Sequence, residues 1–415
     1  MTGRLGPGLI TGAADDDPSG IATYSQAGAQ FGFNLLWTVV LTYPLMVAVQ
    51  LVSARIGRVT GRGLAANLLR VLPAWAVGGL VVLLLVANTI NIGADVAAMG
   101  AATGLLIGGD VRLAAIGFVI VSLLLQLFVP YHRYVAMLKW LTLSLLAYCG
   151  VVVSVRIDWF DVAARTFWPR LAATPEALTT VVAVFGTTIS PYLFFWQSSE
   201  EVEDLDQRKE TDLLHASRRK AARELDRIRW DTIVGMGFSN LIAFFVILTT
   251  AATLHAHGRT DIQTSADAAL ALKPIAGPLA SVLFAAGIVG TGLLALPVLA
   301  ASSAYAIGET FGWKIGLERK PQEAVGFYGV IVVSTLLGLG VVYSPFDPIR
   351  ALFWSAVVNG IISVPLMAAM MVVASRRDEM GAYVTTGLGR CLGWSATALM
   401  GLAVTAMLSM VFVAG

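Results

Sequence analysis

The chain contains 415 residues, of which 57% are hydrophobic and only 13% are charged, and its formal net charge is +2. Soluble proteins carry about 25% charged residues, so this composition and a mean hydropathy of +0.77 argue against a soluble enzyme and predict an all-α integral membrane protein in the lipid bilayer. The small net charge argues against a nucleic-acid partner. Cys149 and Cys391 predict neither a disulfide framework nor a metal cluster.

The first predicted element, residues 5–31, is an apolar stretch that acidic residues interrupt. Asp15, Asp16 and Asp17 run directly into a Pro-Ser-Gly sequence at 18–20. Carboxylates are costly at membrane depth and need partners or water. Pro and Gly break the backbone hydrogen bonding, which is tolerated only where the chain faces protein or a wet cavity. We therefore expect a broken helix that carries acid, as at a cation site inside a transporter.

Further apolar segments follow along the chain, each near the roughly 20 residues that a span needs. About eleven transmembrane helices are expected, with an additional short surface helix at 265–273. The expected spans are 5–31 (broken), 33–54, 75–106, 112–130, 135–155, 176–205 (broken), 231–255, 276–307, 325–344, 349–374 and 391–413.

The Lys and Arg residues between these spans predict the orientation. With the N-terminus in the cytoplasm, 21 of the 28 Lys and Arg residues fall on the cytoplasmic side. Because cytoplasmic loops carry the excess of positive charge, we expect a multi-pass protein of the cell inner membrane. Its N-terminus is expected to be cytoplasmic and its C-terminus extracytoplasmic.

Residues 200–231 are the long polar stretch of the chain, which mixes Glu and Asp with Lys and Arg at helical spacing. We expect a solvated cytoplasmic helix that extends the sixth span and leads to the seventh. The alternative interpretation is a regulatory or partner site.

The sixth span is also interrupted, because its residues 184–192 read VFGTTISPY. Spans one and six are each the first of five, and broken spans at matching places point to inverted repeats with the site between them. One transmembrane transporter domain, 1–415, is therefore expected. Its first repeat would be 1–155, its second repeat 176–374, and an additional helix would occupy 391–413.

Asp17 is the strongest candidate for a metal ligand, since it directly precedes Pro18, where the carbonyl of Ala14 and its neighbours would be freed. The alternative is that Asp17 only caps the second half-helix, since Asp is a good N-cap. Asp15 and Asp16 point in other directions on any helix, so at most one of them joins Asp17 at a single ion. The other is expected to face the entry path or solvent.

The second break offers oxygens of its own. Thr187 and Ser190 lie one turn apart before Pro191 and could supply hydroxyl or carbonyl oxygens. The alternative is local hydrogen bonding to a helix end. Gly20 would leave space beside the first break, or would only provide backbone freedom. Carboxylate, carbonyl and hydroxyl oxygens together suit hard divalent ions such as Mg2+, Ca2+ or Mn2+.

Two polar residues in other spans are candidates for the surroundings of the ion or for its pathway. Asp95 lies in an otherwise apolar third span, and an isolated intramembrane acid is functional by default. The alternative is a satisfied packing contact. Asn359 in the tenth span is a weaker candidate of the same kind.

Four segments in order resemble the Nramp divalent-metal-ion transporters. GPGLIT at 6–11, leading to DPSG at 17–20, resembles that family's opening and its Asp-Pro-Gly-Asn motif. ARIGRVTGRGLA at 54–65 is similar to the end of its second span. LKWLT at 138–142 and AYAIGETFGW at 304–313 are similar to parts of its fifth and eighth spans. The resemblance implies an amino-acid-transporter-like (LeuT-type) fold, with two inverted five-helix repeats, unwound first and sixth helices, and one further span.

The family's metal ligands are only partly present. Gly20 stands where the family has its metal-binding Asn, and Ser190 where the Met sulfur of its sixth-span motif binds transition metals. Tyr192 takes the place of the motif's His. The resemblance makes the carbonyls of Ala14 and Thr187 the matching backbone ligands.

Two further departures concern the tenth and third spans. The family's tenth-span Gln is Ala356 in this chain. The third-span Asp-x-x-Glu proton route reads Ile-Gly-Ala-Asp at 92–95, so its first acid is missing. Loss of a soft sulfur ligand favours hard ions. The pattern resembles the Nramp-related magnesium transporters, a branch considered to carry Mg2+ and Mn2+ without proton coupling.

The expected function is import of divalent metal ions, chiefly Mg2+ and Mn2+, by alternating access without proton coupling. The ion is cargo, and no cofactor is expected. One alternative is a proton-coupled Mn2+ or Fe2+ importer of the main Nramp type. Another is an organic-substrate carrier of the same fold, which three aspartates at the break disfavour. An intramembrane aspartyl enzyme would need a dyad such as Asp17 with Asp95, and no other catalytic group supports it.

Overall fold

The computed structural model describes residues 7–129, 143–170, 174–208, 212–262, 264–344 and 347–414. Within these ranges the secondary structure is entirely helical. The LKWLT segment at 138–142, the first residues of the expected first span and the first half of the expected fifth span lie outside the described residues.

The helices of the first part of the chain alternate long apolar elements with short connecting ones. They are α1 (Pro7–Asp15), α2 (Pro18–Phe31), η1 (Gly32–Leu35), α3 (Leu36–Thr60), α4 (Leu64–Val71), α5 (Ala74–Ile107), α6 (Val111–Phe128), η2 (Leu143–Leu145), α8 (Leu146–Ser154) and α9 (Trp159–Phe167). The symbol η marks a short 3-10 helix.

The second part has the same character. It contains α10 (Pro175–Thr188), α11 (Pro191–Arg208), α12 (Arg218–Thr253), η3 (His255–His257), α13 (Ser265–Ala269), η4 (Leu270–Leu272), α14 (Lys273–Ala276), η5 (Gly277–Leu279), α15 (Ala280–Phe311), α16 (Val325–Leu339), η6 (Gly340–Tyr343), α17 (Pro348–Ser375), α18 (Arg377–Met380), η7 (Gly381–Tyr383) and α19 (Gly387–Ala414).

Both predicted breaks are present. The first separates α1 from α2 at Asp16 and Asp17, and the second separates α10 from α11 at Ile189 and Ser190. Each second half-helix starts with a proline, Pro18 or Pro191, whose fixed φ and missing N–H suit the first helical position. The sequence therefore predicted the breaks correctly, because they follow from local backbone chemistry.

The number of spans is consistent with the sequence. Among the described residues, 9 helices are long and apolar enough to cross a membrane, or up to 10 if the bent pair α8 and α9 is one span. One of these segments, Pro18–Thr60, joins α2 to α3. Since α2 is the second half of the broken first span and α3 is a span of its own, about eleven transmembrane helices follow. The division into repeats stays a prediction.

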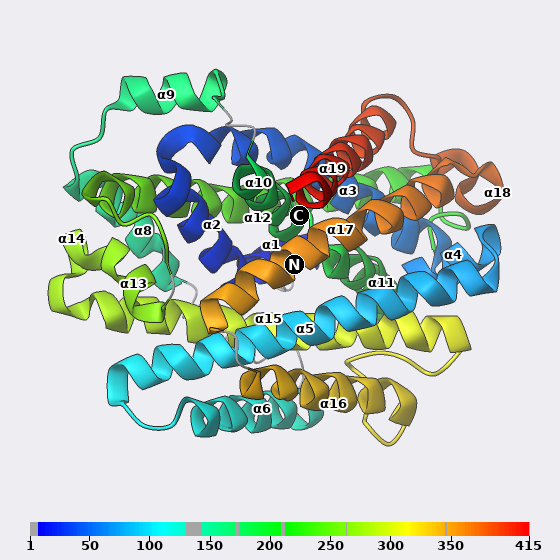
Figure 1. Cartoon of the computed structure of the whole chain (residues 1–415). Coiled ribbons are helices and arrows are strands. Elements are labelled where there is room, and N and C mark those ends of the chain that lie inside the picture. The colour runs from blue at the N-terminus through cyan, green and yellow to red at the C-terminus, as the bar shows by residue number, and fades with distance from the viewer. Residues whose placement is uncertain are drawn as a thin grey trace.

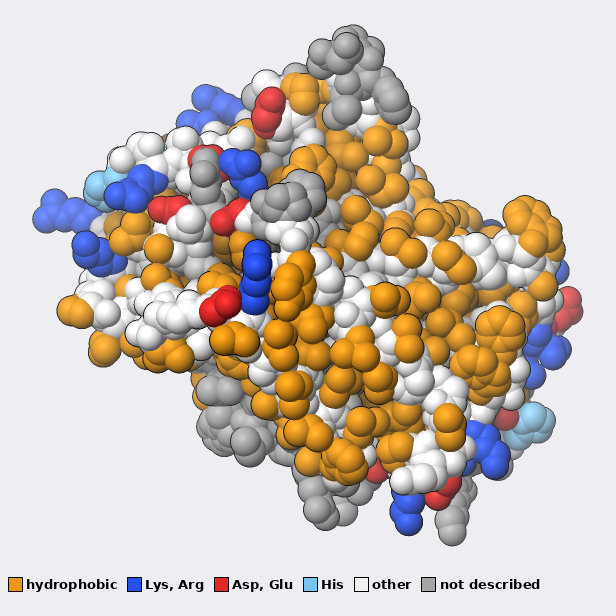
Figure 2. Space-filling model, turned by 60° about the horizontal axis from the view of Figure 1, so that its bottom comes forward, with side chains coloured by type: hydrophobic (Ala, Val, Ile, Leu, Met, Phe, Trp, Pro, Cys, Tyr) orange, Lys and Arg blue, Asp and Glu red, His pale blue; other side chains and the backbone are white. Residues whose placement is uncertain are grey.

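The long helices lie side by side in one bundle (Figure 1). α5 packs along α15, with α6 and α16 outside them, while α1 and α2 pack against α12 and α10 against α17. The space-filling view shows a broad hydrophobic surface across the middle of one face, with charged side chains gathered toward its two ends (Figure 2). Such a belt between charged ends is the surface expected of a protein that spans a bilayer.

Small residues allow the first half-helix to approach α12 closely. Any side chain on Gly12 of α1 would collide with the backbone of Gly235 on α12, and one on Gly8 would meet the backbone of Thr232. Close contact through small residues is typical of helix packing in membranes. It holds α1, and therefore the first break, against α12.

The prediction of a solvated helix at 200–231 is wrong in part. α11 does extend beyond the membrane span and α12 does begin before the next one, but one face of this polar stretch is buried. Glu201 is fully buried and lies 3.6 Å from the guanidinium of Arg58, which is also buried. Arg58 pairs with Asp204 (2.7 Å) and Glu224 (2.6 Å). Because a buried charge requires partners, these acids join the ends of α3, α11 and α12.

A second polar contact brings two of the family-like segments together. Glu309, near the end of α15, accepts hydrogen bonds from the backbone N–H groups of Ala65 (2.9 Å) and Ala66 (3.2 Å) at the start of α4. It also accepts one from the Ser199 hydroxyl of α11 (2.7 Å). A carboxylate at a helix N-terminus satisfies otherwise unpaired N–H groups, so Glu309 fixes α4 against α11 and α15.

We predict that Gly12→Ala destabilises the protein by about 1–3 kcal/mol, because the added methyl group overpacks the contact with α12. Thermal unfolding of the purified protein in detergent measures the change as a lower apparent melting temperature. The control is Gly79→Ala on α5, where nothing lies within 4 Å of an added Cβ. That variant should be neutral or slightly more stable, since Ala is the better helix former. Equal melting temperatures for the two variants would contradict the assigned contact.

Candidate metal site

Asp17 occupies the first break and uses its carboxyl oxygens on three sides. Its Oδ1 accepts hydrogen bonds from the Gly20 backbone N–H (2.7 Å) and the Ser19 hydroxyl (2.8 Å), which makes Asp17 the N-cap of α2. Its Oδ2 accepts one from the Asn91 side-chain amide of α5 (2.9 Å). Asp17 therefore does cap the second half-helix, but it also makes a bond to another span. Because a carboxylate offers about four lone-pair positions, capping leaves room for another bond on Oδ2.

Asn91 links three spans and was missed by the sequence reasoning. Its side-chain oxygen accepts a hydrogen bond from the Ser355 hydroxyl of α17 (2.7 Å), while its amide donates to Asp17. The expectation that Asp95 stands in an otherwise apolar third span was wrong. Asn91 and Asp95 are four residues apart, which places both on one face of α5. That spacing was the signal that could have identified Asn91.

Asp15 and Asp16 do not face solvent. Their exposed fractions are 2% and 3%, and the Ser239 hydroxyl of α12 lies 2.6 Å from Asp15 Oδ2 and 3.0 Å from Asp16 Oδ1. Of the two surroundings expected for one of these acids, the entry path or solvent, solvent is therefore excluded, and the entry path stays a prediction. α12 covers this side of the break, since it packs against both α1 and α2. The single hydroxyl serves both acids, and Asp15 Oδ1 has no partner among the described residues.

The two breaks lie directly against each other. Tyr192, in the first turn of α11, donates its hydroxyl to the carbonyl oxygen of Ala14 at the end of α1 (3.0 Å). Tyr24 of α2 lies with its hydroxyl 3.1 Å from that of Thr188 at the end of α10. All four residues are buried. Residues that stand some 170 positions apart in the chain thus form one polar layer, with the carbonyl predicted as a ligand inside it.

Of the two candidate hydroxyls at the second break, that of Ser190 is hydrogen-bonded and that of Thr187 is not. Ser190 donates to the carbonyl oxygens of Gly186 (3.0 Å) and Thr187 (2.8 Å), so local hydrogen bonding to the helix end occurs as the alternative interpretation expected. The Thr187 hydroxyl has no hydrogen-bond partner among the described residues and faces Gly20. A Cβ on Gly20 would lie 3.1 Å from that hydroxyl oxygen. The missing side chain of Gly20 therefore lets the two breaks approach each other closely.

Asp95 and Asn359 are two further polar residues of the region that lack partners among the described residues. Asp95 is completely buried, and within the described part of the chain neither of its carboxyl oxygens accepts a hydrogen bond. The amide oxygen and nitrogen of Asn359 on α17 are in the same situation. Buried polar groups are normally satisfied. These exceptions mark positions where water, a proton or an ion would be stabilised.

The arrangement offers oxygen atoms from several kinds of group, because the acids in the described part of the chain do not converge on one point. Among the described residues, no group of three or more His, Cys, Asp or Glu side chains could hold a metal ion by itself. Any ion at the breaks would be bound by one carboxylate together with carbonyl, hydroxyl and water oxygens. That is the donor set of hard divalent ions, which retain part of their water.

A cavity of about 470 Å3 opens near the breaks between α2, α10 and α17. Ala22 and Gln26 line it from α2, one and two turns beyond the break, and Thr180 lines it from α10. It lies on the side of the breaks away from the ion pairs of Arg58, which connect the opposite ends of α3, α11 and α12.

Known sequences identify the family. The profile described as natural resistance-associated macrophage protein-like (Nramp) matches residues 8–410. A protein of Burkholderia ambifaria named divalent metal cation transporter MntH is 26% identical, over 95% of this chain and 86% of its own. The protein of the same name from Deinococcus radiodurans is 29% identical, over 94% of this chain and 86% of its own.

Solved structures agree on the fold. A crystal structure of a manganese transporter from Eremococcus coleocola, in complex with an aromatic bis-isothiourea substituted compound, is similar with a TM-score of 0.78 at 17% identity. It covers 98% of this chain and 87% of the other. Mhp1, a nucleobase-cation-symport-1 family transporter, is similar with a TM-score of 0.59 at 15% identity, over 98% of this chain and 93% of its own.

These similarities confirm the predicted LeuT-type fold and the prediction that the protein is a multi-pass membrane transporter and not an enzyme. They do not distinguish the magnesium branch. The chain belongs to the Nramp family of divalent-metal-ion transporters.

Proposed function

We propose that this protein imports Mn2+ by alternating access, with the ion bound between the two helix breaks. The observation that carries the proposal is the contact of the breaks, in which Tyr192 reaches the Ala14 carbonyl at 3.0 Å beside Asp17. Manganese is favoured over magnesium because the similar proteins are named divalent metal cation transporters or manganese transporters. The proposal follows the alternative of a main-type Nramp importer of Mn2+, and not the function first expected from the resemblance to the magnesium branch.

The proposed ligands are the Asp17 carboxylate, the carbonyls of Ala14 and Thr187, and the Ser190 hydroxyl. Ala14 would exchange the hydrogen bond from Tyr192 for the ion, and Asp17 would use the remaining lone pair of Oδ2 beside Asn91. Gly20 would let the two breaks approach the same ion, because no side chain separates them. Mn2+ accepts carboxylate, carbonyl and water oxygens, so the site needs no sulfur.

Mg2+ is the second candidate cargo, and one observation favours it. Ser190 stands where the family motif has a Met, so the soft ligand that selects thiophilic ions is replaced by a hydroxyl. An all-oxygen site discriminates weakly between Mn2+ and Mg2+ on ligand type. We therefore expect this transporter to admit both ions, with Mg2+ carried in a more hydrated form.

We further propose that proton movement accompanies uptake. Asp95 is buried with both carboxyl oxygens free of hydrogen bonds in the described part of the chain, and Asp15 has one such oxygen. Carboxyl groups in this position are proton relays in other transporters. This corresponds to the proton-coupled alternative. The membrane potential would assist entry by about 2.3 kcal/mol per charge per 100 mV.

Ions would reach the site through the cavity between α2, α10 and α17. The ion pairs around Arg58 would close the other side and would have to separate in the opposite access state. With the cytoplasmic N-terminus expected from the Lys and Arg distribution, the cavity would face outward and could serve as the entrance of the proposed importer. A bacterial inner membrane is the proposed location.

The Asp17→Asn variant tests the site. Asn keeps the N-cap through its side-chain oxygen, but its amide NH2 replaces the Oδ2 that accepts from Asn91. The variant should therefore still fold, with a stability loss on the order of one hydrogen bond, about 1 kcal/mol. It should nevertheless lose Mn2+ uptake into proteoliposomes by at least about tenfold, because loss of one charged ligand costs about 1.4 kcal/mol or more. The matched control is Asp110→Asn, since Asp110 caps α6 in an exposed position. Uptake by Asp17→Asn equal to that of the unchanged protein would end this assignment.

The Ser190→Met variant tests the choice of ion. A thioether at the second break should raise the preference for Mn2+ or Cd2+ over Mg2+ by several-fold, since sulfur favours softer ions. Competition of Mg2+ against Mn2+ uptake measures this preference. Leu178→Met, a similar-sized change on α10 away from the breaks, controls for an added thioether. An unchanged ratio in Ser190→Met would contradict the location of Ser190 at the ion.

Coupling is tested with a pH-sensitive dye inside the liposomes. We expect Mn2+ uptake to acidify the lumen, and Asp95→Asn to reduce the protons moved per ion at least about twofold, because it removes a buried proton acceptor. Glu176→Gln, at the start of α10 beside the cavity, is a control that should leave this ratio unchanged. Uptake without any acidification would instead support the uncoupled, magnesium-type transporter.

A further inference from the structure

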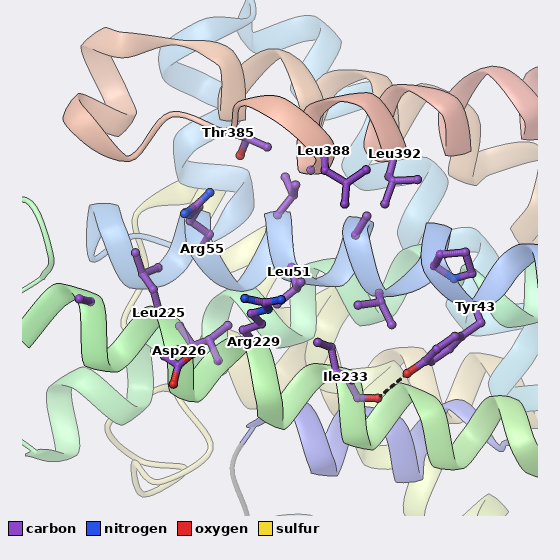
Figure 3. Close-up of a pocket in the computed structure, with 17 residues that line it drawn as sticks. Tyr43, Leu51, Arg55, Leu225, Asp226, Arg229, Ile233, Thr385, Leu388 and Leu392 are labelled. Atoms are coloured by element: carbon purple, nitrogen blue, oxygen red, sulfur yellow. Dashed lines mark hydrogen bonds between the residues drawn. The ribbon is translucent and has the colours of Figure 1, made fainter.

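A second cavity, unrelated to the helix breaks, lies on the outer side of the bundle between α3, α12 and α19. Its volume is about 620 Å3, and its walls are mainly aliphatic and aromatic. Figure 3 shows Leu388 and Leu392 of α19 on the upper side of the cavity, with Leu51 of α3 between them and the side chains of α12. Leu388 is 74% exposed, so the cavity is open to the surroundings of the protein. We call this cavity the α3–α12–α19 groove.

The groove is closed at one end by a polar contact and is charged at the other. The Tyr43 hydroxyl of α3 donates to the carbonyl oxygen of Ile233 on α12 (3.1 Å) at the first end (Figure 3). Arg55 of α3 and Arg229 of α12 project into the groove toward the second end. Asp226 lines the groove as well. The walls therefore carry two positive charges and one negative charge.

Neither arginine is committed to another group. Within the described residues, Arg55 and Arg229 form no ion pair and no side-chain hydrogen bond, whereas the nearby Arg58 and Arg227 are each paired with two or more acids. Arg55 is half-buried among apolar side chains. A guanidinium in such surroundings gains from an anionic partner more than one in open water does.

A third group at the charged end points to a ligand. The Thr385 hydroxyl lines the groove near Arg55, is only 2% exposed, and has no hydrogen-bond partner in the described part of the chain (Figure 3). Buried hydroxyls are normally satisfied. Two uncommitted guanidinium groups and one unsatisfied hydroxyl at the same end match the donors that hold a phosphate group.

The depth of the charged end fits a lipid headgroup. Arg55 lies near the end of α3, which stops at Thr60, and Trp230, next to Arg229, is 58% exposed. Exposed Trp residues gather where the hydrocarbon meets the headgroups. From this end the apolar walls run along α3 and α19 toward Tyr43 and Leu392, in the direction that an acyl chain would follow.

We propose that the α3–α12–α19 groove binds one anionic phospholipid, whose phosphate is held by Arg55, Arg229 and Thr385 and whose acyl chain lies along Leu51 and Leu392. The net positive charge of the walls favours a lipid with a net negative headgroup over a zwitterionic one. Basic pockets between membrane helices recognise anionic headgroups in this way. The site joins α3 and α19 to α12, the helix that packs against the first break.

The test uses native mass spectrometry of the purified, delipidated full chain, titrated separately with phosphatidylglycerol and phosphatidylcholine of identical acyl chains. We expect one phosphatidylglycerol to bind about tenfold more tightly than phosphatidylcholine, from two arginines that each attract an anionic lipid. The double variant Arg55→Gln/Arg229→Gln should abolish this preference. Arg223→Gln, an exposed arginine of α12 that does not line the groove, should leave it intact.

A second variant separates a groove from simple surface charge. Gly389→Phe fills the groove from α19, where an added Cβ makes only an ordinary contact with Thr385, and both arginines remain. It should also remove the tight phosphatidylglycerol. Equal binding of the two lipids by the unchanged protein would overturn the proposal, as would a Gly389→Phe variant that keeps the preference. If the double variant does not fold, Arg229→Gln alone replaces it, because Arg229 is exposed.

Discussion

Polar groups at the broken first span must find partners inside the protein, and this constraint organises the rest of the structure. The bilayer core holds no water that could bond to a carboxyl or backbone group, so an unpaired group there costs free energy. Each group at the break therefore draws on another span. Asp17 is bonded by Asn91 of α5, the acids before it by Ser239 of α12, and the Ala14 carbonyl by Tyr192 of α11. The site is assembled from helices far apart in the sequence.

Some polar groups around the breaks form no hydrogen bond within the described residues, and they indicate where a ligand would bind. Asp95, Thr187 and Asn359 surround the breaks with polar atoms that lack partners among the described residues. Each such atom costs on the order of 1–3 kcal/mol when it is left buried and unbonded. Unbonded buried polar atoms are tolerated where a transient ligand forms the missing bonds. The transported ion, its remaining water and a proton are ligands of that kind, and the family to which the chain belongs carries divalent metal ions.

At the end of the bundle where α3 and α11 stop, buried charged side chains likewise need partners. Arg58 and Glu201 are buried beyond the span ends and are paired within one network with Asp204 and Glu224. Breaking such a network by removing one partner is expensive, although the intact network adds little net stability. Ion pairs of this kind hold the helices in one geometry. When the helices separate, water can solvate the same charged groups. This property suits the side of a transporter that has to open and close.

The sequence alone determined what depends on neighbouring residues. Pro18 and Pro191 remove hydrogen bonds locally, so both breaks were predictable, and runs of apolar residues defined about eleven spans because bilayer thickness sets their length. The four family-like segments predicted the family and its fold. The choice of ion was not predictable to the same degree, because an oxygen-only donor set suits Mn2+ and Mg2+ alike.

Only the tertiary structure decided how distant residues meet. No local signal indicates that Ser239 lies beside Asp15 and Asp16, so solvent had remained open as one of two surroundings for these acids. The charged face of 200–231 was taken as solvated because its partner, Arg58, lies some 140 residues earlier. Helical spacing specifies which face of a helix is polar, but the neighbour of that face depends on packing, and packing is a property of the whole chain.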